Sequence, residues 1–179
     1  LVYLERDGTG WDILCLSDVP AQARSVEFLT RQPSLRFVRQ NQTRCPYLKL
    51  APSWAELSRT LSQSMRYDVG RKQKKFEKEP EARFSPIRDR CRLPDAWKEF
   101  VQLNSKRMAE RGIAGPFEDA RFRDFHEAVI PMLFDRDMLR LCALELGSPI
   151  GYIYIMKFCR KYFFYQIGFD PRWNKVSPG

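Results

Sequence analysis

The fold is decided by residues 138–169, which read MLRLCALELGSPIGYIYIMKFCRKYFFYQIGF. Three apolar runs of strand length, at residues 138–146, 150–158 and 162–169, are separated by Gly147-Ser148-Pro149 and by Arg160-Lys161. Connections this short return the chain alongside itself as antiparallel hairpins. The sequence therefore predicts a meander of three neighbouring antiparallel strands.

The segment before this meander predicts one strand and two helices. Residues 82–93 are typical of a strand that Pro86 interrupts, which favours an edge position or a bulge. Residues 95–111 and residues from about 118 onward carry apolar side chains at helical spacing. We expect Gly112 to end the first of these helices and Pro131 to kink or loosen the end of the second.

The first eighty residues predict a second group of elements. Residues 11–16 and 35–39 are typical of strands, residues 21–31 of a helix, and residues 47–50 of a short extended piece. Ser53 and Glu56 form a capping box, so a helix is expected to begin there. This helix should reach about residue 79 in one or two pieces, because Gly70 can break it and Pro80 should end it.

The charge balance points to an anionic partner. The chain has 179 residues, 31 Lys and Arg against 22 Asp and Glu, and a net charge of +9. Nucleic acid, an anionic membrane surface and a phosphate-bearing co-substrate all satisfy this balance. One predicted helix holds six bases with few stacking aromatics, which disfavours nucleic acid. They are Arg66, Arg71, Lys72, Lys74, Lys75 and Lys78.

Cysteine usage and hydropathy bear on the compartment. The five cysteines are scattered and none lies in a C-x-x-C spacing, so neither a disulfide scaffold nor a zinc site is expected. No apolar run approaches the roughly 18 residues of a membrane span, and no signal peptide opens the chain. We therefore expect a cytoplasmic protein without a bound metal, for which peripheral contact with a membrane remains compatible with the charge.

The last residues predict an anion site. The third strand of the meander runs into Gly168-Phe-Asp-Pro171, and a basic loop then leads to Ser177-Pro-Gly179. Ser followed by Pro is a typical helix opening, and the N–H groups of a helix N-terminus bind phosphate. Arg172 and Lys175 add positive charge beside it.

Several motifs, taken in order, carry a resemblance to a known family. The motifs are Cys45-Pro-Tyr-Leu48, Ser53-Trp54, the basic helix at residues 65–79, Arg111-Gly-Ile-Ala-Gly-Pro-Phe117, Ser148-Pro-Ile-Gly-Tyr152, Gly168-Phe-Asp-Pro171 and Ser177-Pro-Gly179. On them the chain resembles the GNAT acyltransferases, and in particular the CelD/BioF-like acetyltransferases related to the FemAB peptidoglycan-bridge enzymes. The resemblance spans nearly the whole chain.

This resemblance implies an α+β protein with the GNAT-like acyl-CoA N-acyltransferase fold. The sheet would be mixed but largely antiparallel, and the fold would be incomplete at both ends. It also implies two GNAT-like units. Residues 1–52 would be the tail of a preceding unit, residues 53–80 basic linker helices, and residues 81–179 the N-terminal two-thirds of a GNAT-like acyltransferase domain.

The resemblance further implies acetyl-CoA or another acyl-CoA as co-substrate. Residues beside the thioester would be Gln166, Ile167, Gly168 and Phe169, and residues receiving the diphosphate would be Arg172, Lys175, Ser177, Pro178 and Gly179. The family's Q/R-x-x-G-x-G/A phosphate signature is replaced here by Lys175-Val-Ser-Pro-Gly179, with a single glycine. An aminoacyl-tRNA donor, as in the FemAB relatives, therefore stays open.

The expected reaction is direct transfer of the acyl group to an amino or hydroxyl acceptor, in cell-envelope or exopolysaccharide (cellulose-type) biosynthesis. The acceptor must lose a proton, for which Asp170 and Tyr165 are the candidate catalytic residues. Asp170 precedes a proline and is equally typical of a turn or cap. His126, the only histidine, is assigned to packing or to the helix surface.

The acceptor would be anionic or a lipid-linked sugar, with Arg71, Lys72, Lys74, Lys75 and Tyr152 as candidate contacts. A solvated helix is the alternative reading of the four bases. Two alternatives to an enzyme remain open from the sequence: a non-catalytic GNAT-like binding module, and a basic domain that contacts RNA or tRNA.

Overall fold

The computed structural model divides the chain into two compact units, Leu1–Leu50 and Ala51–Gly179. In the first unit, helix α2 spans Arg24–Thr30, within the predicted helix, and residues 45–50 form neither helix nor strand. The strands predicted at residues 11–16 and 35–39 fall largely outside the described residues. The structure describes Ile13, Cys15, Leu16, Val19, Pro20, residues 23–32, Arg36, Val38 and residues 45–176. For Lys175 and Val176 it describes the backbone without the side chain.

Two helices open the second unit. Helix α3 spans Trp54–Thr60, and the Ser53 hydroxyl accepts the Glu56 N–H at 3.2 Å, which confirms the predicted cap. Helix α4 spans Gln63–Glu77. The break between them lies at Leu61 and Ser62, because Ser62 caps a new helix by accepting the Met65 N–H. The expectation of a break at Gly70 was wrong, since Gly70 lies inside α4.

The rest of the unit follows the predicted order of strand, two helices and three strands. Strand β1 spans Ala82–Pro86, helix α5 Leu93–Glu110, helix α6 Ala120–Asp135, β2 Leu139–Leu146, β3 Ser148–Phe158 and β4 Lys161–Phe169. The described strands pair in the order β1-β2-β3-β4, and all the pairings are antiparallel. The predicted α+β fold and its antiparallel meander are confirmed.

Pro131 lies inside α6, which ends at Asp135. Two other segments differ from the prediction. β1 ends at Pro86 instead of residue 93, because Asp89 caps a 3₁₀ turn at Arg90–Arg92 that leads into α5. The segment expected to be a basic loop after Asp170 is a 3₁₀ helix, Pro171–Val176.

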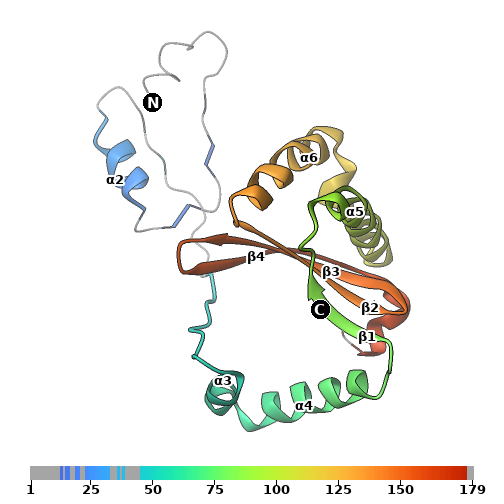
Figure 1. Ribbon diagram of the computed structural model, residues 1–179. Coiled ribbons are helices and arrows are strands. Elements are labelled where there is room, and N and C mark those ends of the chain that lie inside the picture. Colours follow the sequence, from blue (N-terminus) through green and yellow to red (C-terminus); the bar gives the residue numbers. More distant parts are fainter. Residues whose placement is uncertain are drawn as a thin grey trace. The chain divides into compact units, whose positions relative to one another are not determined.

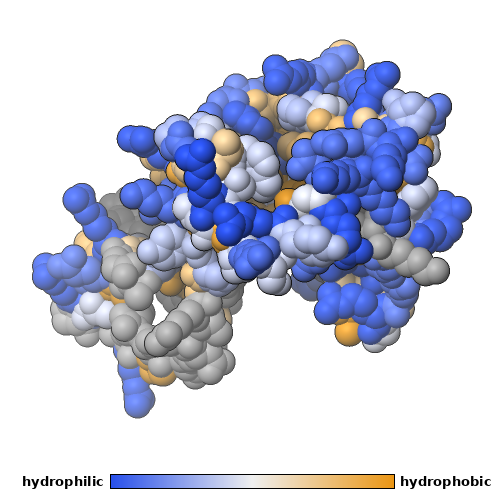
Figure 2. Space-filling model, turned by 90° about the horizontal axis from the view of Figure 1, so that it is seen from below, coloured by the Kyte–Doolittle hydropathy of each residue, from blue (hydrophilic) through white to orange (hydrophobic). Residues whose placement is uncertain are grey.

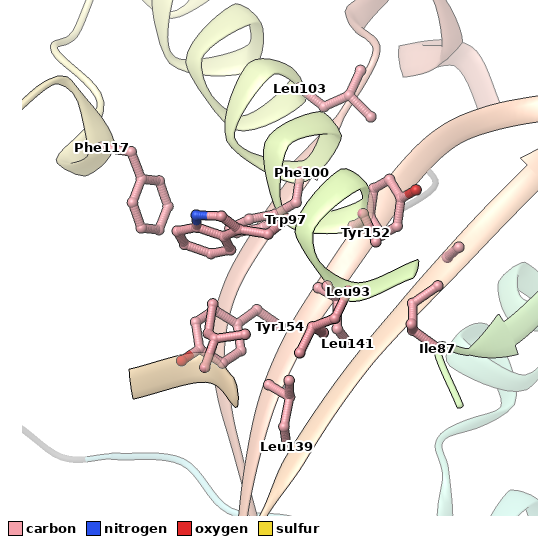
Figure 3. Close-up of a cluster of buried hydrophobic side chains, with 13 residues drawn as sticks. Ile87, Leu93, Trp97, Phe100, Leu103, Phe117, Leu139, Leu141, Tyr152 and Tyr154 are labelled. Atoms are coloured by element: carbon pink, nitrogen blue, oxygen red, sulfur yellow. The ribbon is translucent and has the colours of Figure 1, made fainter. Parts of the chain in front are cut away.

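Both α5 and α6 pack on one face of the sheet (Figure 1). The core between these helices and the sheet is rich in aromatic rings, and Phe100, Phe117 and Tyr154 are at most 1% exposed. Figure 3 shows Trp97 and Phe100 of α5 near Phe117 and Tyr154. Burying one such side chain contributes roughly 1.5–3 kcal/mol, so this layer accounts for much of the stability.

Helix α5 lies unusually close to β4 at Gly168. A Cβ added to Gly168 would lie 2.6 Å from the Asn104 backbone N and 2.7 Å from the Phe100 carbonyl oxygen. The Asn104 side-chain amide also donates to the Ile167 carbonyl oxygen at 2.8 Å. Gly168 is therefore required by the approach of α5 to the strand.

Helix α6 contributes His126 to the same core, where the side chain is only 3% exposed. Six aromatic rings have centroids 4.7–5.8 Å from the imidazole. Burial lowers the pKa of His126, because a charged imidazolium would lose its hydration. The packing role assigned to His126 agrees with this burial.

We predict that Gly168→Ala destabilises the protein by about 1–3 kcal/mol, because the new methyl group meets helix backbone that cannot rotate away. Chemical denaturation measures the change. Gly70→Ala is the matched control: nothing lies within 4 Å of its added Cβ, so it should be neutral or stabilise by up to about 1 kcal/mol. Equal stability of Gly168→Ala and the wild type would contradict the close approach.

We also predict that the free energy of unfolding falls as the pH is lowered from 7 to 5. The unfolded chain binds a proton at His126 below a pH of about 6.5, whereas the folded state resists it, so stability is lost toward acid. The slope contributed by His126 is at most about 1.4 kcal/mol per pH unit. Urea denaturation at pH 5, 6 and 7 should show a shallower dependence for His126→Gln, and equal slopes would refute the prediction.

Candidate active site

Tyr165 lies at an irregularity of β4. Tyr154 pairs with Gln166 and the next residue, Ile155, pairs with Phe164, so the ladder skips Tyr165. A bulge of this kind leaves one residue outside the pairing and re-aims its side chain. Tyr165 is half-buried and packs against the core. The candidate catalytic tyrosine thus occupies the one position where β4 departs from regular pairing with β3.

The Tyr165 hydroxyl meets His126 from α6. His126 Nε2 lies 3.2 Å from the Tyr165 hydroxyl oxygen, and His126 Nδ1 lies 3.4 Å from the Tyr154 hydroxyl oxygen. Burial raises the pKa of Tyr154, with a smaller contribution from Tyr165, so the Tyr154 phenol stays protonated at neutral pH. A neutral imidazole therefore bridges two tyrosine hydroxyls.

Asp170, the other catalytic candidate, is engaged with Arg172. The Arg172 guanidinium donates to both carboxylate oxygens, at 2.7 Å for the shortest contact, and the Arg172 backbone N–H also donates to Asp170 Oδ1. These bonds lower the pKa of Asp170, chiefly through the side-chain hydrogen bond. A carboxylate held this way is a weak proton acceptor, and its geometry favours the turn and capping role that the sequence also allowed.

The residues expected to hold the co-substrate have different environments. Ile167, Gly168 and Phe169 are buried, and Gln166 is half-buried. The Phe169 ring lies under the Arg107 guanidinium, 5.0 Å from ring centroid to Cζ. Ser177, Pro178 and Gly179 lie outside the described residues, as does the Lys175 side chain.

An open pocket borders the end of β4. Its cavity volume is about 270 Å³, and it lies beside the Asp170–Arg172 pair. The Arg172 side chain is 84% exposed, so its guanidinium stays accessible to an anion while it holds Asp170. The lining residues are Leu146, Ser148, Pro149, Ile150, Asp170, Arg172 and Trp173.

Tyr152, a candidate acceptor contact, is only 2% exposed. Its hydroxyl donates to Glu99 Oε2 at 2.5 Å. Burial, and then this carboxylate, raise the pKa of Tyr152. The hydroxyl is therefore already committed to a partner inside the fold, which makes direct contact with an acceptor unfavourable.

Three basic residues of α4, together with its C-cap residue Lys78, lie on one side of the helix. Arg71, Lys74, Lys75 and Lys78 recur at intervals of three and four residues and are all exposed, so they form one stripe. Lys72 is half-buried and shares the opposite side with Val69 and Phe76. We call the four exposed bases the α4 stripe. Figure 2 views the molecule from the side on which α4 lies in Figure 1 and shows mainly hydrophilic residues on that face.

The fold thus joins Tyr165 with His126 and Tyr154, and Asp170 with Arg172. The sequence did not point to His126 or Tyr154 as site residues. A single histidine on an amphipathic helix has no local pattern that distinguishes a packed side chain from a functional one. The missing signal is the contact between His126 of α6 and Tyr165 of β4, which lie 39 residues apart in the chain.

In the described part of the chain, no group of three or more His, Cys, Asp or Glu is placed to hold a metal ion. None of the helices described is long and apolar enough to cross a membrane.

Comparison with known proteins identifies the fold family. Searches of curated proteins and of solved structures found no significant match. A family model described as an acetyltransferase (GNAT) domain matches residues 63–179, which include β1 to β4 with α5 and α6. Because this match spans well over half of the sequence, the chain belongs to the family of acetyltransferase (GNAT) domains.

Proposed function

We propose that the protein transfers an acyl group from acetyl-CoA or another acyl-CoA to the amino or hydroxyl group of an anionic acceptor. The acceptor class is a phosphorylated or lipid-linked sugar of cell-envelope or exopolysaccharide synthesis, as the resemblance to CelD/BioF-like enzymes suggests. The observation that carries the proposal is the bulge in β4, because it takes Tyr165 out of the β3–β4 pairing on the strand along which the thioester is expected to lie.

The edge of the described sheet supports acyl-CoA as the donor. β4 is the last strand in the described order, and an edge strand offers N–H and C=O groups to an extended ligand. The pantetheine arm of CoA carries two amides that can bond such an edge. Farther along, Arg172 beside the pocket is the described residue suited to a diphosphate oxygen. The residues present therefore fit this co-substrate.

Tyr165 is the residue best suited to move a proton during transfer. The acceptor nitrogen or oxygen attacks the thioester carbonyl carbon, the C–S bond breaks, and the departing thiolate needs a proton. The Tyr165 phenol supplies that proton, and the acceptor's own proton restores it. Asp170 would then serve to fix Arg172 and the 3₁₀ helix that follows β4.

The α4 stripe is the proposed contact for the acceptor's negative charge. Its four bases are exposed on one side of the helix. Among the described residues, only Arg71 of these four forms an ion pair, with Asp68 at 3.7 Å. Lys72 lies on the other side, so we assign the role to Arg71, Lys74, Lys75 and Lys78.

Isothermal titration of the full chain with acetyl-CoA tests the proposal directly. We expect saturable binding that does not depend steeply on salt. Absence of heat at millimolar acetyl-CoA would overturn the proposal. Steeply salt-dependent binding of a single-stranded RNA oligonucleotide in its place would support the alternative of a basic RNA-contacting domain.

We predict that Tyr165→Phe lowers the rate of acetyl-CoA turnover roughly a hundredfold, because the proton donor is lost while the ring is retained. CoA release measured by chromatography reports the rate, and titration should give unchanged acetyl-CoA affinity. Tyr162→Phe is the matched control on the same strand, since Tyr162 is 53% exposed. Equal rates for the two variants would rule out proton transfer by Tyr165.

We predict that replacing Arg71, Lys74 and Lys75 together by Ala removes a preference for anionic acceptors. With glucosamine 6-phosphate and glucosamine as probes, the wild type should show a lower KM for the phosphorylated amine. The triple variant should raise that KM roughly threefold or more and leave glucosamine and acetyl-CoA unaffected, since exposed charge pairs are individually weak. Lys72→Ala, which removes a base from the opposite side, should leave the KM for both amines unchanged. If the wild type had equal KM values for glucosamine 6-phosphate and glucosamine, this would count against acceptor binding by the α4 stripe.

A further inference from the structure

The hydrogen bonds of His126 link Tyr154 in the core to Tyr165 on β4. Both ring nitrogens face a tyrosine hydroxyl, Nδ1 that of Tyr154 at 3.4 Å and Nε2 that of Tyr165 at 3.2 Å. Tyr154 is 0% exposed and His126 3% exposed, so water does not compete for the bond between them. On β4 this chain of hydrogen bonds reaches Tyr165, which is half-buried.

Hydrogen-bond accounting decides where the imidazole proton lies. Within the described residues, His126 is the hydrogen-bond partner of the Tyr154 hydroxyl. If Nδ1 carried the proton, it would donate to Tyr154, and the buried Tyr154 proton would lack an acceptor. A buried donor without an acceptor is costly. Tyr154 therefore donates to Nδ1, and since a neutral imidazole has one N–H, that proton lies on Nε2.

We infer that His126 is a positioning residue for Tyr165: Tyr154 holds the imidazole in the Nε2–H tautomer, and Nε2–H donates to the Tyr165 oxygen at the β4 bulge. This inference rests on the proposed function, which assigns proton transfer to Tyr165. The Tyr165 oxygen accepts from His126, so the Tyr165 proton is directed to a group other than His126.

The arrangement has a consequence for the transfer step. When Tyr165 gives its proton to the departing thiolate, a phenolate oxygen is left. The His126 Nε2–H already points at that oxygen and stabilises the negative charge without rearrangement. The proton lost by the acceptor then returns to Tyr165, so the products are the acylated acceptor and CoA thiol, and His126 and Tyr154 end as they began.

The tautomer can be measured without ambiguity, because His126 is the only histidine in the chain. Two-bond ¹H–¹⁵N correlation spectra of the ¹⁵N-labelled full chain distinguish Nε2–H from Nδ1–H. We expect Nε2–H in the wild type and in Tyr162→Phe. Tyr154→Phe removes the hydroxyl that donates to Nδ1, so the Nδ1 resonance should shift. Nε2–H is expected to persist in this variant, because an Nδ1–H would be a buried donor without an acceptor. A dominant Nδ1–H tautomer in the wild type would overturn the inference.

Kinetics of acetyl-CoA turnover distinguish positioning from packing. His126→Leu fills the site but cannot donate, so the turnover rate should fall at least tenfold with unchanged acetyl-CoA affinity. His126→Gln retains a side-chain N–H and should recover part of the rate. An unchanged rate in folded His126→Leu would overturn the positioning role, even with the expected tautomer.

The two proposals fail in different ways. If the wild type does not bind acetyl-CoA, the proposed function fails, and the role of His126 in transfer fails with it. If acetyl-CoA binds and Tyr165→Phe is impaired while the wild type shows Nδ1–H, only the inference about His126 fails. The spectra need no acceptor and no turnover, so they decide the tautomer even if His126→Leu does not fold.

Discussion

The contact on which the rest of the structure depends is the approach of the α5 backbone to β4 at Gly168. No side chain separates the two there, because a Cβ on Gly168 would lie under 3 Å from the helix backbone. This approach brings Trp97 and Phe100 down onto Tyr154, and it lets Asn104 donate to the Ile167 carbonyl. The candidate site is built on the same strand, so its position relative to α5 follows from this one glycine.

The candidate site combines two features that conflict with regular packing. The β4 bulge leaves Tyr165 outside the strand pairing, and α6 buries an imidazole among aromatic rings. Each feature alone would cost stability, but together the bulge supplies His126 with a hydroxyl partner. The first residues of β4 behave differently. Tyr162, Phe163 and Phe164 are 47–64% exposed, so a run of aromatic residues in a strand did not here mean a buried core.

The sequence predicted the elements of this fold better than it predicted the site. Short connections at Gly147 and near Arg160 required hairpins, and helical spacing indicated α5 and α6 correctly. Boundaries failed where a single polar side chain intervened, as Ser62 did between α3 and α4 and Asp89 did after β1. For the site, Tyr165 was selected as a neighbour of the expected thioester, whereas the hydrogen bonds of Asp170 and Tyr152 to Arg172 and Glu99 could not be foreseen.

The sequence by itself determined the order of strands and helices, the antiparallel meander and the excess of positive charge, because these depend on residue spacing and composition over short stretches. Only the tertiary structure decided that His126 meets Tyr165 and Tyr154, that Gly168 serves helix packing, and that Lys72 of α4 is half-buried while Arg71, Lys74 and Lys75 are exposed. The physical reason is range. Local patterns specify backbone conformation, but hydrogen bonds between side chains tens of residues apart exist only after burial has brought their elements together.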